Sequence, residues 1–285
     1  MSLLLDAANW PLGWPLSAIT VTATLYLFGG WTSATSTSLA KRGRGAAFYA
    51  GLVVLALAVC SPIDAFADAL FWVHMVQHVL LMMVAPPLLL LGRPWPRLLR
   101  PLPLAFRRSV AKVVLVGPTL APARRLGSWL ARPLPSCALF STVLLAWHLP
   151  VLYDLTLQHW LIHDLEHALF FGAALLFWIH LVPAASSRPQ LAAGQRAISA
   201  TSALLVSWIL AIVLGLAPRP LYLSYAARET RPGGLSALAD QHLAAGIMWV
   251  PGSIPYAIVI AISIIQWLGP VAGASHRQEL VRHRG

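Results

Sequence analysis

The chain of 285 residues is 58% hydrophobic and has a mean hydropathy of +0.72, and only 10% of its residues are charged. A water-soluble domain could not keep such a surface in solution, so the composition indicates an integral membrane protein. The formal charge of +11 would suggest nucleic acid in a soluble chain. No aromatic-interleaved basic module accompanies it, so we expect no nucleic-acid partner.

Seven stretches are long and apolar enough to cross a hydrocarbon core of ~30 Å, which requires roughly 20 helical residues. In chain order they are 12–31, 46–62, 69–91, 134–153, 160–182, 197–216 and 238–268. Because Pro251, Gly252 and Pro255 lie inside the last stretch, we expect a kink or an unwound turn there. The sequence therefore predicts an all-α bundle of about seven transmembrane helices, which forms a single domain over residues 1–285. We expect no cleavable signal, since the first 15 residues lack a basic region and carry Asp6.

Basic residues alternate sharply between the connections. The connection after the sixth stretch holds only Arg219, Arg228 and Arg231, while the other 17 of the 20 basic residues lie on the opposite side. By the positive-inside rule, the N-terminus is expected outside and the C-terminus in the cytoplasm. The long segment 92–133 then forms a basic cytoplasmic loop facing anionic lipid headgroups, and its middle, 104–116, is expected as a helix on the membrane surface.

Seven of the ten histidines fall on the predicted outer side, where most of the acidic residues also lie. Residues four apart share one face of a helix, and two such pairs are present, His74 with His78 and His163 with His167. Polar residues inside a membrane are costly and usually functional. The pattern therefore predicts a metal site in the outer half of the bilayer, with these four imidazoles as ligands.

Further groups are candidates for a supporting role at this site. As additional ligands we consider His242, His148, Met82, Met248 and Cys60. We expect Asp240, Glu166 and Gln77 to orient the ligands from behind. Imidazole suits several metals, whereas thioether and thiol groups favour cuprous copper. Because Met82 continues the stripe of His74 and His78, the sequence favours copper, with zinc as the alternative.

Two other readings of the same histidines stay open. The segment from His163 to His167 matches the H-x-x-E-H pattern, in which two histidines bind zinc and a glutamate acts as base. The protein would then be an intramembrane zinc-dependent hydrolase, with Glu166 or Asp240 as base. In the third reading, histidines on facing helices bind a haem. The copper reading predicts that the protein is not an enzyme.

Several motifs resemble one known family. They are His74-Met75-Val76-Gln77-His78, Ala85-Pro86-Pro87-Leu88, Leu91-Gly92-Arg93-Pro94, Trp147-His148-Leu149-Pro150 with Tyr153-Asp154, the His163–His167 segment, and Asp240-Gln241 with Gly246, Met248 and Trp249. In this order they are similar to the polytopic CtaG family, assembly factors associated with caa3-type cytochrome c oxidase. The resemblance covers about two-thirds of the chain.

The resemblance implies a multi-pass protein of the bacterial inner membrane that helps to mature a haem–copper oxidase of the respiratory chain. The expected function is to bind copper in the outer histidine site and to deliver it to oxidase subunit I or II. A periplasmic copper chaperone is an expected further partner, beside the lipid bilayer. The family motif does not fix His159 and His242.

Overall fold

The computed structural model describes residues 13–31, 39–182 and 191–282, and all regular structure in these ranges is helical. The all-α prediction is therefore confirmed. The N-terminal residues for which we expected no cleavable signal, Asp6 among them, lie mostly outside the described residues.

The helices follow one another with short connections. In chain order they are α2 (Trp14–Trp31), α3 (Leu39–Val59), α4 (Pro62–Ala67), α5 (Phe71–Val79), the π-helical turn η2 (Leu80–Val84), α6 (Ala85–Leu91), α7 (Pro94–Leu99), α8 (Leu104–Ala111), η3 (Lys112–Val116), η4 (Pro118–Leu120), α9 (Ala121–Leu130), α10 (Pro133–Trp147), α11 (Pro150–Gln158), α12 (Trp160–Leu181), α13 (Ala193–Leu216), α14 (Leu223–Ala226), η5 (Pro232–Gly234), α15 (Ala237–Trp249), η6 (Pro251–Ser253) and α16 (Ile254–Arg282).

Five helical segments of the described chain are long and apolar enough to cross a membrane. They are Arg42–Val59, Phe71–Leu91, Trp160–Leu181, Ala193–Leu216 and Ala237–Gly269. A sixth is present if the bent pair Pro118–Leu130 and Pro133–Trp147 counts as one span. Although α2 occupies the first predicted stretch with 18 residues, it is not among these candidates. The number seven and the sides of the two termini therefore stay predictions.

The predicted single span 134–153 is wrong at its C-terminal end. Helix α10 ends at Trp147 after 15 residues, and α11 begins at Pro150. Proline lacks an N–H group and disfavours the helical conformation of the residue before it, so the chain turns at His148 and Leu149. The expected break in the last span is confirmed, because η6 separates α15 from α16 at Pro251.

The basic segment 92–133 is largely helical. Helix α8 and the π-turn η3 cover 104–116, where we expected a helix, and α9 is a further helix that the sequence did not indicate. The segment 118–130 meets α10 at 89°. Its apolar side chains are exposed, as at Phe106, Leu115 and Leu126, and their placement on a membrane surface stays a prediction.

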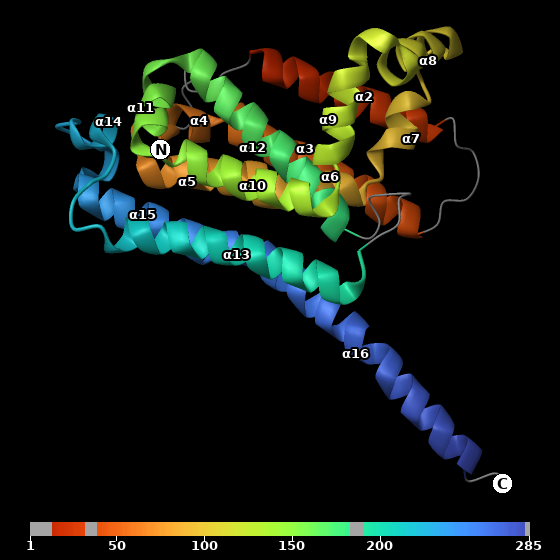
Figure 1. Ribbon diagram of the computed structural model, residues 1–285. Coiled ribbons are helices and arrows are strands. Elements are labelled where there is room, and N and C mark those ends of the chain that lie inside the picture. Colours follow the sequence, from red (N-terminus) through yellow and green to blue (C-terminus); the bar gives the residue numbers. More distant parts are fainter. Residues whose placement is uncertain (1–12, 32–38, 183–190, 283–285) are drawn as a thin grey trace.

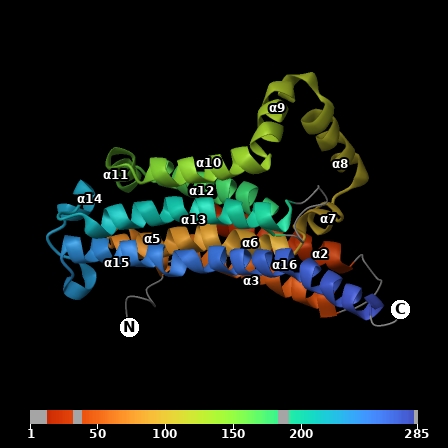
Figure 2. The same ribbon diagram turned by 60° about the horizontal axis from the view of Figure 1, so that its bottom comes forward.

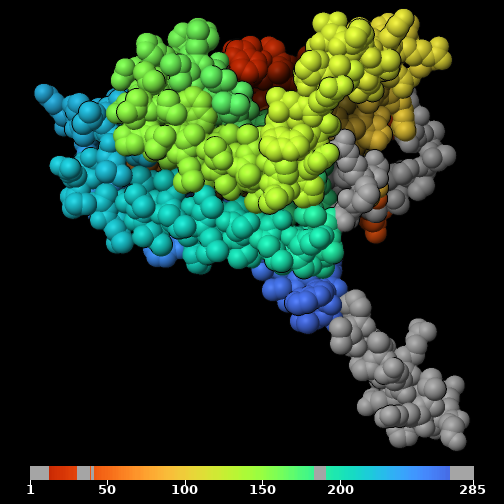
Figure 3. All heavy atoms as spheres, viewed as in Figure 1, coloured from red at the N-terminus to blue at the C-terminus, as the bar shows by residue number. Residues whose placement is uncertain are grey.

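The bundle has two different ends (Figure 1). One end carries α4, α11 and α14 together with the first turns of α5, α12 and α15, and the other carries α7, α8 and α9. The α5–η2–α6 rod packs against α15, α3 and α12, and Figure 2 shows it running between the outer helices. In the space-filling view, α10, α11, α12 and α13 form a continuous wall over it (Figure 3).

The rod is continuous in spite of two consecutive prolines. Pro86 and Pro87 have no N–H group, so the carbonyl of Met82 lacks its ordinary helical donor. The π-turn η2 contains one residue more than an ordinary α-helical turn, because the Ala85 amide bonds to the Leu80 carbonyl, five residues earlier. The indole Nε1 of Trp178, on α12, donates to the Met82 carbonyl oxygen at 2.8 Å. A side chain of the neighbouring helix thus satisfies the backbone that the prolines leave open.

Candidate metal centre

Four side chains from α5 and α12 meet inside the end of the bundle that carries α4, α11 and α14. His74, His163, Glu166 and His167 each offer a ligand atom, and these atoms all lie within 4.8 Å of one another. His74 and Glu166 are fully buried. The three α12 residues share a face because they are three and four positions apart. This group of four, which we call the outer cluster, joins the two helices that carry the predicted histidine pairs.

His78 adjoins the outer cluster but is not one of the four. Its Nε2 lies 3.7 Å from Oε1 of Glu166, while Nε2 of His74 lies 3.7 Å from Oε2 of the same carboxylate. Glu166 therefore faces the rings of both α5 histidines. We expected Glu166 only behind the ligands, whereas the structure places its carboxylate among the ligand atoms. The atoms that the structure brings together thus belong to three imidazoles and one carboxylate, with His78 beside them. The set of four imidazole ligands stays a prediction.

Two tyrosines fix the orientation of the His74 ring. Its Nδ1 lies 2.7 Å from the hydroxyl of Tyr153 and 3.1 Å from that of Tyr225. Burial raises the pKa of Tyr225, so its hydroxyl stays protonated, and it donates to the carbonyl oxygen of Ala67 at 2.5 Å. The Tyr225 oxygen can then accept from Nδ1–H of His74. A proton on Nδ1 leaves the lone pair on Nε2, the atom that faces Glu166.

The outer cluster and the adjoining His78 are rich in buried polar atoms that lack a hydrogen-bond partner within the described part of the chain. They are Nε2 of His74, both ring nitrogens of His78, Nε2 of His163, Nε2 of His167 and both carboxylate oxygens of Glu166. Leaving a buried polar atom unpaired costs about 1–3 kcal/mol. Such atoms gathered around one point fit a cation that would bind several of them together.

Two neighbouring carboxylates, Asp240 and Asp154, bind backbone N–H groups rather than imidazole. Asp240, which we expected to orient a histidine ring, accepts from the backbone N–H groups of Phe71 and Trp72 at 3.0 and 2.9 Å. It therefore holds the first turn of α5, which carries His74. Asp154 accepts from the N–H groups of Leu223 and Ser224 and so holds α14, which carries Tyr225.

Gln77 also differs from its expected role. Its side-chain amide donates to Oδ1 of Asp64 at 2.6 Å and to the carbonyl of Ala58 at 2.9 Å. Gln77 thus ties α5 to α3 and α4 rather than supporting an imidazole. Burial raises the pKa of Asp64 above its ordinary value, although the bond from Gln77 opposes this effect.

The remaining candidate ligands lie apart from the outer cluster. His242 is exposed on α15, as is His159 at the start of α12. Cys60 is buried, and burial raises the pKa of its thiol, which disfavours the thiolate that binds metals. His148, Met82 and Met248 line a separate small cavity together with His78.

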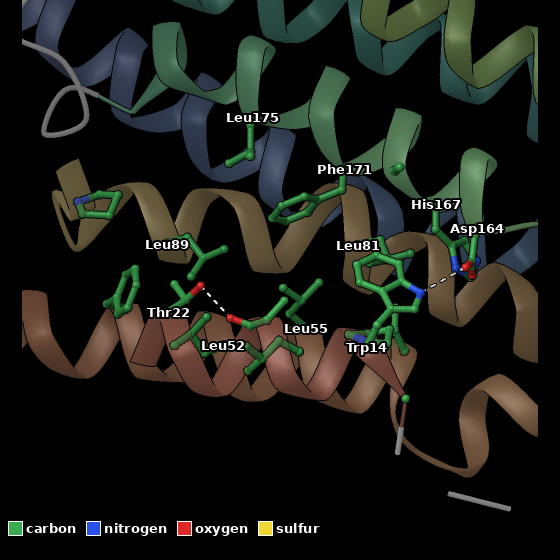
Figure 4. A pocket seen from close by; sticks show the side chains of 18 of the residues that line it. Trp14, Thr22, Leu52, Leu55, Leu81, Leu89, Asp164, His167, Phe171 and Leu175 are labelled. Carbon is green, nitrogen blue, oxygen red and sulfur yellow. Dashed lines mark hydrogen bonds between the residues drawn. The ribbon is translucent and has the colours of Figure 1, made fainter. Parts of the chain in front are cut away.

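A larger apolar cavity of about 540 Å³ reaches the outer cluster from the side of α2 and α3. Asp64, Asp164 and His167 line one end, and apolar residues such as Leu89 and Phe171 line the rest. Figure 4 shows Asp164 accepting from the indole of Trp14 beside His167; the donor–acceptor distance is 3.2 Å. The two acids give the cavity a negative end next to the cluster.

The sequence reasoning overlooked Tyr153 and Tyr225. Tyr153 lies on α11, five residues after His148, and the Tyr153-Asp154 motif was visible in the sequence. Tyr225 comes from a connection without helical periodicity, and its contact with His74 spans 151 residues of sequence. No local pattern could have indicated it.

The chain is similar in sequence to known proteins. The family model of the cytochrome c oxidase caa3 assembly factors (Caa3_CtaG) matches residues 24–269. Uncharacterized proteins of Mycobacterium bovis and Mycobacterium tuberculosis are each 26% identical over 228 residues, which is 79% of this chain. The chain spans about a third of the length of these relatives, since 34% of each is covered. No solved structure matches.

Proposed function

The chain belongs to the family of cytochrome c oxidase caa3 assembly factors, and from this membership we propose that it binds copper at the outer cluster and delivers it to an oxidase subunit. The observation that carries the proposal is the convergence of His74, His163, Glu166 and His167 with their unpaired ligand atoms. Copper is the cargo in this reading, and the protein is not an enzyme.

The donor set supports a transition metal. Imidazole nitrogen suits copper, zinc, iron and nickel, whereas magnesium and calcium prefer oxygen. Two unpaired α12 imidazoles together with His74 Nε2 would supply three nitrogens, and Glu166 one oxygen. The choice of copper over zinc rests on the family and on the methionines that surround the adjoining His78.

A route for the cargo follows from the charges around the cluster. Asp64 and Asp164 line the end of the large cavity beside His167, and carboxylates attract a cation. In the bacterial inner membrane, with the predicted orientation, this end faces the periplasm. There a copper chaperone would supply the ion, and subunit I or II of the oxidase would receive it.

A zinc-dependent hydrolase is the second candidate. It is favoured by the position of Glu166 on the same helix as His163 and His167, in the order of the H-x-x-E-H pattern. In such a site the glutamate acts as base on a metal-bound water and does not bind the metal. Asp240, the other base that we considered, is occupied by two backbone N–H groups and does not suit this role.

The experiment compares oxidase maturation in cells that carry the wild-type chain or a variant. We expect His163→Ala combined with His167→Ala to lower the copper content of the purified oxidase severalfold. His242→Ala is the matched control, because it removes an exposed histidine from the same end of the bundle, and it should leave the copper content unchanged. Excess copper in the medium should restore the oxidase in the double variant.

Two results would count against copper delivery. One is an unchanged oxidase copper content in the double variant. The other is a purified chain that contains zinc alone, which would favour the hydrolase. A Soret band in the purified chain would support the haem reading instead.

A further inference from the structure

A second cavity is lined by His78 but not by Glu166, and it gathers methionines from distant parts of the chain. Met75, Met82, Met83 and Met248 all line it, together with His78 and His148. These four are every methionine after Met1. They come from the α5–η2–α6 rod and from α15, so no single helix explains their meeting.

The size of this cavity suits an ion. Its volume is about 30 Å³, and a space of roughly 10–15 Å³ already holds one water molecule. It is therefore large enough for a bare ion and too small for an organic molecule. Methionine commonly fills gaps in apolar cores. Here a gap persists between the methionines, and His78 lines it with both ring nitrogens lacking a hydrogen-bond partner in the described chain.

The contact between His148 and Met75 would suit a bound cation. Nδ1 of His148 lies 2.8 Å from the carbonyl oxygen of Leu144, which can only accept, so Nδ1 carries the proton. In a neutral imidazole the lone pair is then on Nε2. This atom lies 3.4 Å from the sulfur of Met75, which also has only lone pairs to offer. Two electron-pair donors thus face each other inside the bundle.

The spacing of the two imidazoles fits a shared ion. A metal–nitrogen bond of about 2.0–2.1 Å puts a ring centroid roughly 3 Å from the metal. The rings of His78 and His148 have centroids 6.0 Å apart. One ion between them would therefore be in reach of both, with the thioethers around it.

We propose that this cavity, which we call the methionine chamber, is a second metal site and binds cuprous copper through His78, His148 and the surrounding methionine sulfurs. Soft thioether ligands select cuprous copper over zinc. His78 is the link between the two sites, because it borders the chamber and also lies 3.7 Å from Glu166. The proposal rests on the proposed function only for the route by which copper arrives.

The test distinguishes the two sites with two metal ions, a soft one that prefers sulfur ligands and a harder one that does not. The purified full chain in lipid nanodiscs is titrated with Ag⁺, a redox-inert substitute for cuprous copper, and separately with Zn²⁺, and bound metal is measured by mass spectrometry. The chamber variant carries Met75→Leu, Met82→Leu and Met248→Leu, which conserve side-chain volume. Leu144→Ile is the matched control, since it alters the chamber wall without removing a ligand atom.

We expect the chamber variant to bind Ag⁺ at least about tenfold more weakly, since loss of even an outer partner of a metal ligand costs about 10–100-fold in affinity. Its Zn²⁺ binding should equal that of the wild type, which also shows that the variant is folded. Leu144→Ile should bind both metals normally. Wild-type Ag⁺ affinity in the chamber variant would overturn the proposal.

If the proposed function is wrong, the same titrations give a different result. If the outer cluster binds no metal, His163→Ala with His167→Ala leaves Zn²⁺ binding unchanged, whereas the Ag⁺ result for the chamber variant is unaffected. Silver X-ray absorption provides the second readout. It should show sulfur neighbours in the wild type and fewer in the chamber variant, which keeps only Met83 of the four methionines. An absence of sulfur in the wild type would also overturn the proposal.

Discussion

The pivotal residue is His74, which lies between two tyrosine hydroxyls and the Glu166 carboxylate. Tyr225 donates its own proton to Ala67 and can accept from Nδ1 of the His74 ring, which would leave Nε2 of His74 for the cluster. Asp240 and Asp154 act indirectly, because they bind the backbone at the starts of the helices that carry His74 and Tyr225. The placement of the His74 ring is thus set by groups that lie outside the outer cluster.

The first prediction concerns Tyr225. Tyr225→Phe removes one of the two hydroxyls that meet Nδ1 of His74 and should weaken Zn²⁺ binding at the outer cluster about 10–100-fold. Isothermal titration of the purified protein measures the affinity. Tyr256→Phe is the matched control, because Tyr256 is equally buried and its hydroxyl has no hydrogen-bond partner among the described residues. Equal affinity in the two variants would show that Tyr225 does not orient His74.

At the scale of the elements, the rod α5–η2–α6 decides where the ligands lie. Its first turn is held by Asp240, and its middle is a π-turn forced by Pro86 and Pro87. The Cβ of an alanine at Gly51, on α3, would come within 2.9 Å of the backbone nitrogen of Leu89. Glycine at this position therefore lets α3 approach the rod closely, as small residues do between membrane helices.

The second prediction concerns the π-turn. Trp178→Phe leaves the buried Met82 carbonyl without its donor and should destabilise the protein by about 1–3 kcal/mol. Thermal unfolding in detergent measures the loss as a lower Tm. Trp267→Phe, at a site that is 65% exposed, is the control and should have little effect. A Tm that is the same in both variants would contradict this role of Trp178.

The third prediction concerns the start of α5. Asp240→Ala removes both acceptors of the Phe71 and Trp72 amides and should cost about 0.5–2 kcal/mol, as the loss of a helix cap does. Asp240→Asn keeps one acceptor oxygen and should recover part of this loss. Thermal unfolding again measures the stability, and an Asp240→Ala protein as stable as the wild type would refute the capping role.

At the scale of the whole molecule, the two ends of the bundle differ in chemistry. The outer cluster, Asp64 and Asp164 lie at the end of α4, α11 and α14, whereas the basic segment of α7, α8 and α9 lies at the other (Figures 1 and 2). The positive-inside rule assigns this second end to the cytoplasm.

The fourth prediction tests that assignment. In a background with Cys60→Ser and Cys137→Ser, a cysteine at the exposed Thr230 should react with a membrane-impermeant maleimide in intact cells. A cysteine at the exposed Ser128 of α9 should react only after permeabilisation. The reverse pattern would invert the orientation and place the outer cluster on the cytoplasmic side.

Features that depend on neighbouring residues in the sequence could be predicted, whereas features that depend on contacts between distant segments could not. Apolar length and i,i+4 spacing are local, so the helical fold and the pairs on α5 and α12 could be predicted. The proline before α11 was visible, but its power to end α10 at Trp147 was underestimated. Three features depend on contacts between distant segments. They are the contacts of the two tyrosines with His74, the capping role of Asp240, and the position of the Glu166 carboxylate beside His74. No sequence pattern indicates those contacts.

The most direct test of the central claim is the metal content of the protein purified without added metal. Mass spectrometry should find copper in the wild type and about one equivalent less per chain when His163→Ala and Glu166→Gln are combined. His242→Ala should match the wild type. Copper content that is unchanged in the double variant, or zinc as the sole metal of the wild type, would contradict copper binding by the outer cluster.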